Sequence, residues 1–393
     1  MNRPKKPCRS TINIHTKNRA IEMTLPYFCL IKLAILKVVH IIEALGGGVY
    51  TYFKDLSCHF GEDEIRKNIC TTIIYSGNRK EIDSEKIESE FLNGVSLIKI
   101  NMVREFSPSQ DFKSIIHLRK ELQRLNPDVI HLHSSKAGVL GRIACFSLFK
   151  RKKIFYTPHG YSFLRTDISY LTKKIYWLIE KKNQQLFGGE TIACGDTEYQ
   201  IAQKIGKSHL VRNGIDIAAV NNCVTETKND ILTIGIAARI TEARNPKLFN
   251  EIALRFPECN FVWIGDGELN TQITAPNIRI TGWLMERKEV LKELNAIDIY
   301  IQTSLWEGLP IAVLEAMALK KPVLATNVIG NKDIVVPNEN GFLFNDIEEL
   351  DKYFELLKDD KIRTEFGNKA FERCNALFDK NKNFKALSAL YQQ

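Results

Sequence analysis

The sequence lacks the short motifs that mark dinucleotide-binding enzymes, P-loop NTPases and zinc proteins. It has no Gly-x-Gly-x-x-Gly fingerprint and no Walker loop, so neither nucleotide site is expected in its usual form. Its nine cysteines are odd in number and include no Cys-x-x-Cys pair. Since structural zinc sites and disulfide frameworks rely on regular cysteine spacings, the sequence predicts a reduced cytoplasmic protein whose thiols are buried or incidental.

Long apolar runs are also missing. The apolar stretch 27–36 is interrupted by Lys32 and is too short to span a bilayer, and no clear small-residue cleavage site indicates a signal peptide. Residues 1–35 hold seven basic side chains and one acidic side chain. We expect this leader to be disordered or to be upstream sequence read from an early start codon. An interfacial membrane anchor is the alternative.

An excess of one charge is confined to half of the chain. The 393 residues carry a formal net charge of +9. Residues 1–216 have 34 basic and 21 acidic side chains, a net +13, whereas residues 217–393 have 21 and 25, a net −4. The N-terminal half is therefore predicted to face an anionic partner. Because no aromatic-basic nucleic-acid module is present, we expect the cytoplasmic face of an anionic membrane and no nucleic acid.

Two segments would contribute to such a membrane surface. The run 146–153 joins two phenylalanines to four consecutive cations, and the pairs Lys173–Lys174 and Lys181–Lys182 flank the apolar stretch 175–179. Basic residues beside apolar ones suit a membrane interface. A solvated, charged loop is the alternative interpretation of both segments.

The length predicts two domains, and both halves show strands that alternate with helices. In the first half, strands are expected at 37–45, 68–75, 95–100, 129–132 and 153–156, with helices at 49–60 and 113–125. Further strands are expected at 231–237, 260–264, 278–281, 297–301 and 322–325. This alternation is typical of α/β proteins and predicts two Rossmann-like, doubly wound parallel sheets.

The domain boundaries follow from the same pattern. The segment 217–230 is polar and has no periodicity, so it is expected to be a linker. It separates an N-terminal domain at 36–216 from a C-terminal domain at 231–375. The last residues, 376–393, are predicted to form a C-terminal helix.

The most informative motif contains two glutamates, Glu307 and Glu315, eight positions apart. The first lies in a Trp-Glu-Gly-Leu loop after an expected strand, and the second lies about one turn into an apolar helix that begins near Pro310. A carboxylate there is costly to bury unless it is hydrogen-bonded. Vicinal sugar hydroxyls would satisfy Glu315, and a nearby arginine is the alternative partner.

This motif, with 320–330 and 340–344 following it in order, resembles the Glu-x7-Glu signature of retaining glycosyltransferases of family four, in particular members that assemble bacterial surface polysaccharides. The resemblance implies the GT-B fold, in which the two domains face each other across a cleft and the last helix crosses back to the first domain. It also implies that Glu315 accepts hydrogen bonds from the donor ribose and that Glu307 lies at the donor sugar as a catalytic residue. Gly308 and Leu309 would supply N–H groups to the donor sugar and phosphate.

The donor diphosphate is expected at strand ends. Arg239 and Arg244 follow the strand 231–237, and guanidinium groups pair well with phosphate oxygens. The family usually has Gly-Arg there, with a lysine five residues later, so Ala238 and Arg244 depart from its pattern. Surface salt bridges are the alternative role for the two arginines. Gly47 and Gly48 follow the first strand and are expected to approach the diphosphate, with a tight strand–helix turn as the alternative.

Histidines and a tryptophan complete the predicted site. His159, in Thr-Pro-His-Gly, is similar to the same polysaccharide subgroup and is expected to act at the sugar or the acceptor. His133, Ser134 and Lys136 are candidate acceptor contacts. Alternation places His131 on the same strand face as His133, but a metal site would need a further ligand, and none is predicted. Gly265 and Trp283 are expected at the nucleotide base, although Trp283 is equally compatible with a place in the core.

These observations predict a retaining hexosyltransferase that transfers a sugar from a nucleotide diphosphate donor to a hydroxyl of a lipid-linked glycan. No cofactor is expected, and no Asp-x-Asp motif suggests a metal ion. The expected location is the cytoplasm, at the inner face of the membrane. A GT-B nucleotide-sugar epimerase, an NAD-dependent oxidoreductase with paired Rossmann domains and a non-catalytic sugar-nucleotide binding protein are the alternatives.

Overall fold

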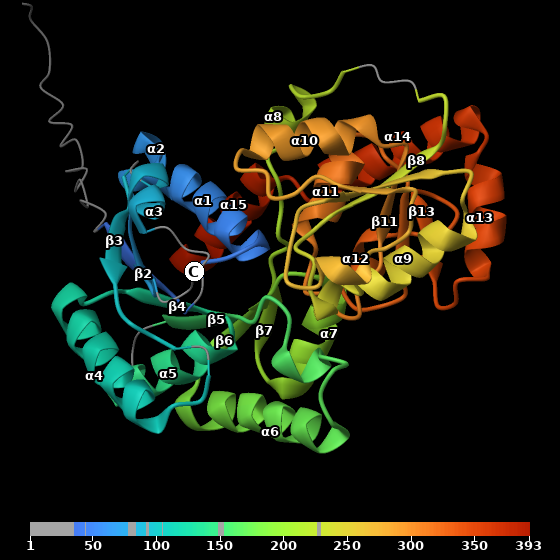
Figure 1. Cartoon of the computed structure of the whole chain (residues 1–393). Helices are drawn as coiled ribbons and strands as arrows, with labels where there is room; N and C mark the ends of the chain where they lie inside the picture. The colour runs from blue at the N-terminus through green and yellow to red at the C-terminus, as the bar shows by residue number, and fades with distance from the viewer. Residues whose placement is uncertain are drawn as a thin grey trace, which may run out of the picture. The chain divides into compact units, whose positions relative to one another are not determined.

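The computed structural model describes residues 35–43, 45–77, 84–91, 94–103, 105–147, 153–225 and 229–393, with only the backbone for residues 84–86. The expected leader and the cations at 150–152 lie outside these residues. Both expected domains are present as parallel α/β layers (Figure 1). None of the described helices is long and apolar enough to cross a membrane.

The first sheet has seven parallel strands in the order β3-β2-β1-β4-β5-β6-β7. Their bounds are β1 Leu36–Ile42, β2 Ile69–Tyr75, β3 Ser96–Lys99, β4 Val129–His133, β5 Lys153–Thr157, β6 Glu190–Ala193 and β7 Ser208–Leu210. The first five match predicted strands. Strands β6 and β7 were not predicted, because they have four and three residues and include polar side chains.

Helices cover both faces of this sheet (Figure 1). They are α1 Gly48–Gly61, α2 Asp63–Arg66, α3 Ser84–Glu90, α4 Pro108–Leu125, α5 Ser135–Cys145, α6 Tyr170–Phe187 and α7 Asp196–Ile205. Helix α1 packs Phe53 and Phe60 into one core, and α4 and α5 bury Leu118 and Leu140 in the core on the other face. Helix α4 begins five residues before the predicted start because Pro108 occupies its first turn.

The second sheet has six parallel strands in the order β10-β9-β8-β11-β12-β13. They are β8 Thr233–Ala237, β9 Asn260–Ile264, β10 Ile278–Ile280, β11 Ile299–Gln302, β12 Val323–Thr326 and β13 Gly341–Phe344. The helices of this half are α9 Pro246–Arg255, α10 Arg287–Ala296, α11 Ile311–Ala318, α12 Asn331–Ile334, α13 Glu349–Leu357 and α14 Asp360–Leu377. Pro310 is the N-cap of α11, one position before the expected place.

The expected linker is helical at its start. Helix α8, Ile217–Asn221, begins after Asp216, whose side chain accepts a hydrogen bond from the backbone of Ala219. Ile217 and Val220 are buried in the core of the second half. This part of the segment is therefore packed and ordered, because two apolar residues three positions apart share one helix face.

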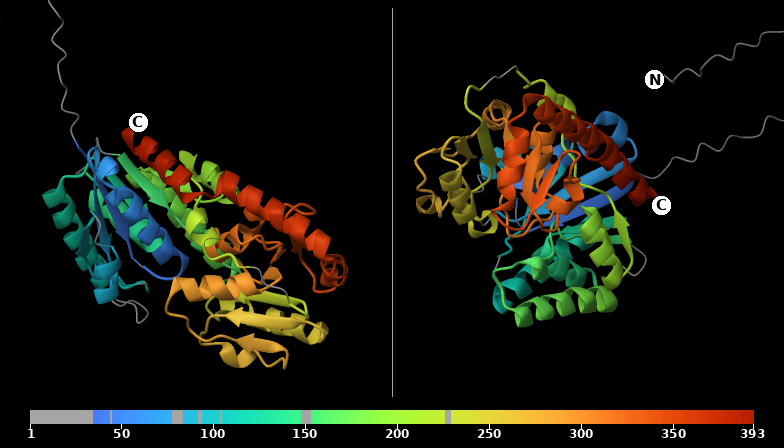
Figure 2. Two further views of the ribbon diagram at one scale, coloured as in Figure 1. Left: turned by 90° about the horizontal axis from the view of Figure 1, so that it is seen from above. Right: turned by 90° about the vertical axis from the view of Figure 1, so that its right-hand side faces the viewer.

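The last helix, α15 Lys380–Gln392, returns to the first domain, as the resemblance implied (Figure 2). Its Phe384, Leu387 and Tyr391 are buried in the core beside α1. Where the chain crosses back, Ile215 donates its N–H to Phe378 O at 2.9 Å and accepts a hydrogen bond from the N–H of Lys380 at 3.0 Å. The two crossings between the domains thus lie side by side as a short parallel ribbon.

Candidate active site

Two glycine-containing loops from different domains interlock at the carboxyl ends of the two sheets. A Cβ on Gly308 would lie 2.8 Å from the carbonyl carbon of His159, and a Cβ on Gly160 would lie 3.2 Å from the Cα of Gly308. Such contacts admit only glycine at Gly308. The Glu307 loop after β11 and the His159 loop after β5 therefore form one site, at the strand edge where open α/β sheets bind ligands.

Two surface hollows, of about 450 and 470 Å³, lie elsewhere. The first is lined by Thr233, Asn260 and Ile278, at the amino ends of β8, β9 and β10. The second is lined by Lys153 and Glu190, at the amino ends of β5 and β6. Because ligands of α/β sheets bind at the opposite strand ends, we do not assign these hollows to the site.

Glu307 is buried and held through one oxygen. Its Oε1 accepts hydrogen bonds from Gln302 Nε2 at 2.6 Å and Ser304 Oγ at 2.7 Å, and it also forms an ion pair with Arg244 Nη1. The other oxygen, Oε2, has no partner among the described residues. The carboxylate is therefore fixed in place while one oxygen remains available to a ligand.

The residues that fix Glu307 come from the end of β11 and the loop after it. Tyr300, Gln302 and Ser304 alternate along the chain, so their side chains lie on one face. Tyr300 donates its O–H to Gln302 Oε1 at 2.8 Å, which orients the amide so that its N–H₂ faces Glu307. These supporting residues were not predicted, although positions 300, 302 and 304 recur with a period of two in the sequence.

Glu315 projects from α11 and is also held through a single oxygen. Arg287 Nε donates to its Oε1 at 3.0 Å, and Arg287 Nη2 lies 2.8 Å from the same oxygen without the alignment of a hydrogen bond. Burial raises the pKa of Glu315, and the charge of Arg287 opposes that rise. The expected alternative, a nearby arginine, is thus what the structure shows, and Oε2 is left for a further donor.

The two predicted diphosphate arginines have protein partners. Arg244 ends a short turn after β8 and pairs with the buried Glu307, so its ion pair is not a surface salt bridge. Arg239 follows β8 directly, is half-buried and also interacts within the protein. Both cations therefore stand at the same strand end, as predicted.

The glycine loop after β1 reaches the second domain. A Cβ on Gly48, the first residue of α1, would lie 3.4 Å from Cγ1 of Ile311 at the start of α11. Gly47 has φ of +55° and nothing within 4 Å of a Cβ, so the backbone, rather than packing, favours glycine there. Leu309, expected to supply an N–H, has its side chain buried in the core of the second domain.

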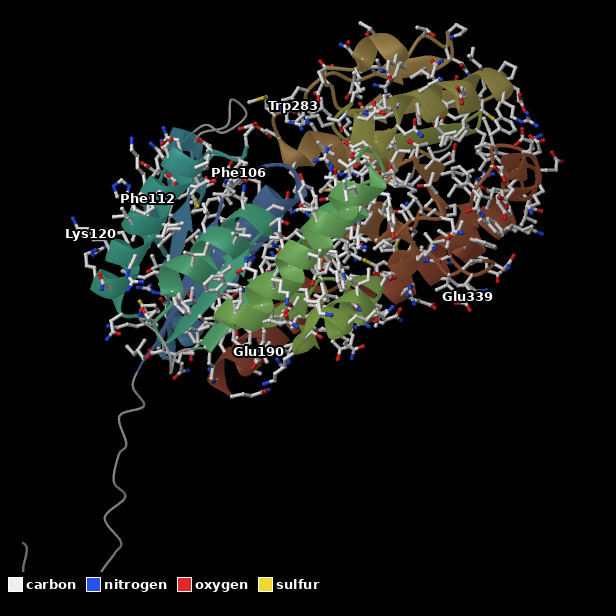
Figure 3. All side chains as sticks on the ribbon, turned by 90° about the horizontal axis from the view of Figure 1, so that it is seen from below. Phe106, Phe112, Lys120, Glu190, Trp283 and Glu339 are labelled. Atoms are coloured by element: carbon white, nitrogen blue, oxygen red, sulfur yellow. The ribbon has the colours of Figure 1, made fainter. Side chains whose placement is uncertain are left out.

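The residues predicted at the base differ in exposure. Gly265 has φ of +132°, and a Cβ there would lie 2.3 Å from Ala238 O, so close backbone packing explains this glycine without a ligand. Trp283 is 60% exposed beyond β10 (Figure 3), and the alternative that placed it in the core is wrong. An exposed indole is available for stacking.

Sequence comparisons agree with this geometry. The family described as Glycosyltransferase Family 4 matches residues 46–219, and the family described as Glycosyl transferases group 1 matches residues 224–373. The UDP-Gal:alpha-D-GlcNAc-diphosphoundecaprenol alpha-1,3-galactosyltransferase of Escherichia coli is 30% identical over 293 residues, which are 66% of this chain and 74% of that protein. The chain belongs to glycosyltransferase family 4. This family assignment does not favour the epimerase and oxidoreductase alternatives.

Two further comparisons support the assignment and the fold. The capsular polysaccharide biosynthesis glycosyltransferase CapM of Staphylococcus aureus is 23% identical over 362 residues, 83% of this chain and 91% of that protein. The crystal structure of Anabaena Alr3699/HepE in complex with UDP and glucose has a TM-score of 0.70 at 17% identity and covers 91% of this chain and all of that chain. The glycosyltransferase therefore has the predicted GT-B architecture.

Of the three residues predicted to contact the acceptor in this glycosyltransferase, one is fully buried and one is already hydrogen-bonded within the protein. His133 is fully buried, which argues against direct contact with an acceptor. Lys136 donates to Asp111 Oδ2 at 2.7 Å and to Glu105 O at 2.9 Å. Ser134 has a φ of +70°, and its buried hydroxyl has no hydrogen-bond partner among the described residues. It is therefore the residue of the three whose side chain could still bond to an acceptor.

The transferase also contains a buried histidine cluster that the sequence did not predict in full. His40 of β1 joins His131 and His133 of β4 because β1 and β4 are neighbours, with His40 opposite His131. Ligand nitrogens of the three lie within 4.8 Å of one another, as a metal site would require. However, His131 is hydrogen-bonded to Tyr391 at 2.5 Å and Thr157 at 2.8 Å, and His40 Nδ1 to His133 Nε2 at 3.0 Å. Five of the six ring nitrogens of the cluster are thus hydrogen-bonded within the protein, and His40 Nε2 is the one without a partner among the described residues.

We predict a histidine-dependent loss of stability in mild acid. Burial lowers the pKa of His40 to about 3, whereas an unfolded histidine binds a proton near pH 6.5. The unfolded chain therefore gains the proton first, so this stability is complete above pH 6.5 and is lost as the pH falls toward 3. Between pH 7 and 5.5, the free energy of unfolding measured with urea should fall by about 1 kcal/mol more in wild type than in His40→Phe. Equal losses in both proteins would contradict the buried, neutral state.

Proposed function

We propose that this glycosyltransferase transfers a hexose, with retention of configuration, from a nucleotide diphosphate sugar to a hydroxyl of a lipid-linked glycan. The acceptor would belong to bacterial O-antigen, capsule or exopolysaccharide synthesis. One observation carries the proposal: Glu307 and Glu315 are both buried, and each is fixed through Oε1 with no partner for Oε2 among the described residues. Two such oxygens beside a glycine loop suit a polyhydroxylated ligand.

In the proposed donor site, different residues contact different parts of the donor. Glu315 Oε2 accepts from the ribose hydroxyls, while the charge of Arg287 opposes the rise in the pKa of Glu315 that burial causes. Arg239 and Arg244 neutralise the leaving diphosphate together with the N–H groups at the start of α11, where the helix dipole favours negative charge. We expect no cofactor and no metal ion for this step.

Glu307 is proposed to contact the donor sugar rather than to attack it. Its charge is balanced by Arg244, and Oε1 accepts two further hydrogen bonds, which together lower its nucleophilicity. Its Oε2 is then oriented to accept from a sugar hydroxyl or to stabilise positive charge that develops at the anomeric carbon. His159, after β5, is proposed to face the same sugar from the first domain.

The nature of the acceptor is supported by relatives. The name of the Escherichia coli relative states a diphosphoundecaprenol-linked acceptor, and that of the Staphylococcus aureus relative states capsular polysaccharide biosynthesis. A lipid-linked acceptor lies at a membrane surface, so the enzyme is proposed to work from the cytoplasm on an anionic inner membrane face.

Helix α6 supports membrane contact because its amphipathic pattern is inverted. Its buried positions are polar: Glu180, Asn183 and Gln184. Large apolar side chains are instead exposed, at Tyr170, Leu171, Ile175, Leu178, Ile179 and Leu186. The lysine pairs 173–174 and 181–182 lie on the same helix. An apolar outer face with cations suits an interface of anionic lipid.

We predict that this helix controls binding to vesicles. The double variant Ile175→Glu/Ile179→Glu should bind phosphatidylglycerol-containing vesicles at least tenfold less than wild type in co-sedimentation, because it places two carboxylates at the anionic surface. The control Leu254→Glu changes a residue that is 55% exposed on α9 and should bind as wild type does. If α6 variant and control retain equal binding, α6 is not the contact.

The proposed function is tested by screening nucleotide diphosphate sugars for thermal stabilisation and then assaying transfer to lipid-linked sugar acceptors. A stabilising donor should yield a glycosylated lipid whose anomeric configuration matches that of the donor. If no nucleotide diphosphate sugar stabilises the protein, the proposal fails. If the donor alone is converted to an epimerised nucleotide sugar, the enzyme is an epimerase and not a transferase. A product whose anomeric configuration is inverted would contradict the retaining mechanism.

A further inference from the structure

Three imidazole rings form a hydrogen-bonded line from the interdomain site into the core of the first domain. His159 Nε2 lies 3.1 Å from His133 Nδ1, and His133 Nε2 lies 3.0 Å from His40 Nδ1. His40 and His133 have no exposed surface. The line therefore connects a residue at the predicted sugar site to two residues that no ligand can touch.

All three rings are neutral because burial lowers their pKa, to about 4 for His159 and about 3 for His40, and well below the ordinary value for His133. A neutral imidazole has one N–H and one nitrogen lone pair. In a line of such rings, each hydrogen bond must run in the same direction. Fixing the tautomer of one ring therefore fixes the tautomers of all three.

The buried end of the line selects the direction. His40 Nε2 is closed off from solvent and has no hydrogen-bond partner among the described residues. Around His40 lie the rings of Phe53, Phe60 and Tyr391, with centroids at 6.0 to 6.1 Å. An N–H in aromatic surroundings gains a weak interaction with π electrons, whereas a bare lone pair gains none from them. The hydrogen bonds should thus be donated inward, from His159 to His133 and from His133 to His40.

Among the described residues, the neighbours of the line pack against its three rings but form no hydrogen bonds with their nitrogens. The ring of His131 lies against that of His133, with centroids 3.9 Å apart and planes tilted by 34°, but its own nitrogens are engaged by Tyr391 and Thr157. The backbone of His159, with φ of +53°, is followed by Gly160, whose N–H donates to the buried Glu198 at 2.8 Å. The backbone at His159 is therefore fixed, the ring of Tyr52 packs edge-on against the His159 ring with centroids 5.1 Å apart, and the tautomer is left to the line.

We propose that His133 and His40 are positioning residues that hold His159 as its Nε2–H tautomer, so that Nδ1 presents a lone pair to a hydroxyl of the bound sugar. The identity of the ligand rests on the proposed function, but the tautomer does not. His159 Nδ1 makes no hydrogen bond to a described residue, so it is available. His133 thus acts on the ligand through His159 and without touching it.

The tautomer is tested in the full-length protein without a ligand, by long-range ¹H–¹⁵N correlation spectra, with the His159 signals assigned from their loss in His159→Gln. We expect a protonated-type shift for Nε2 and a lone-pair-type shift for Nδ1. A protonated Nδ1, or averaged shifts of two exchanging tautomers, would overturn the proposal. This result stands even if no sugar transfer is found.

Two variants separate positioning from structure. His40→Phe keeps an aromatic ring among the aromatic neighbours but removes the acceptor for His133, so the His159 shifts should become averaged and kcat/KM for the donor sugar should fall about tenfold. Affinity for nucleoside diphosphate alone should stay within twofold, since it lacks the sugar. His133→Phe should do the same, and His117→Gln, exposed on α4, should leave shifts and rates unchanged. Equal losses of diphosphate affinity and of kcat/KM, or unchanged His159 shifts in His40→Phe, would refute the proposed positioning.

Discussion

Glu307→Gln should reduce the rate of sugar transfer at least about hundredfold, equivalent to roughly 3 kcal/mol of transition-state stabilisation. The amide keeps the size of the side chain and an oxygen for Gln302 and Ser304. It removes the negative charge, and so leaves Arg244 without its buried counter-ion. The second atom also becomes an N–H₂ donor where an acceptor faces the ligand.

The measurement is single-turnover transfer at saturating donor, with nucleotide diphosphate affinity determined separately. The rate should fall while diphosphate affinity is retained or increases, because Arg244 stays in place and loses its competing carboxylate. Glu339→Gln is the matched control, since this glutamate is exposed on the second domain (Figure 3). A Glu307→Gln rate within threefold of wild type would show that its charge has no part in transfer.

Gly308→Ala should lower transfer about as strongly, but for a steric reason. Its backbone is not in the left-handed region, so alanine adds no local strain. The new Cβ would instead lie 2.8 Å from both the carbonyl carbon and the oxygen of His159, which belong to the other domain. Neither partner is a flexible side chain, so the two loops must separate.

This separation should appear as lost activity with little loss of stability, because the cores of both domains are untouched. Gly341→Ala gives the opposite pattern and serves as the comparison. Its Cβ would lie 1.9 Å from Val323 O within one sheet, so thermal unfolding should occur many degrees lower. If Gly308→Ala lowers the melting temperature as much as Gly341→Ala, the loop contact is a folding determinant and not an active-site contact.

The fold was predictable because periodicity is a local property of the sequence. Strands such as β1, β2 and β4 are largely buried on both faces and contain several β-branched or other apolar residues, which leaves a clear signal. The shorter β6 and β7 have no such signal, because three or four residues cannot establish a period. The buried start of α8 was missed for a similar reason, since five residues include only two apolar anchors.

The candidate site was predictable as far as motifs name residues, but not in what holds them. Glu307 and Glu315 follow from the resemblance, whereas Arg287 becomes a partner of Glu315 only when α10 and α11 pack together. The resemblance to the polysaccharide subgroup suggests His133 as an acceptor contact, but the structure buries it completely. Its burial depends on His40, which lies in a different strand and becomes its neighbour through sheet pairing.

The parallel ribbon at the domain crossing limits how the enzyme can open. Lys380, in this ribbon, forms two ion pairs. Its Nζ lies 3.0 Å from Oδ1 of Asp55 in the first domain and 2.9 Å from Oδ2 of Asp216 beside α8. A single crossing would let the second domain swivel about individual backbone bonds, but two hydrogen-bonded crossings resist torsion and leave bending as the soft coordinate. We therefore expect any opening of the enzyme to follow one bending arc, from which the loops of His159 and Gly308 return to the same register.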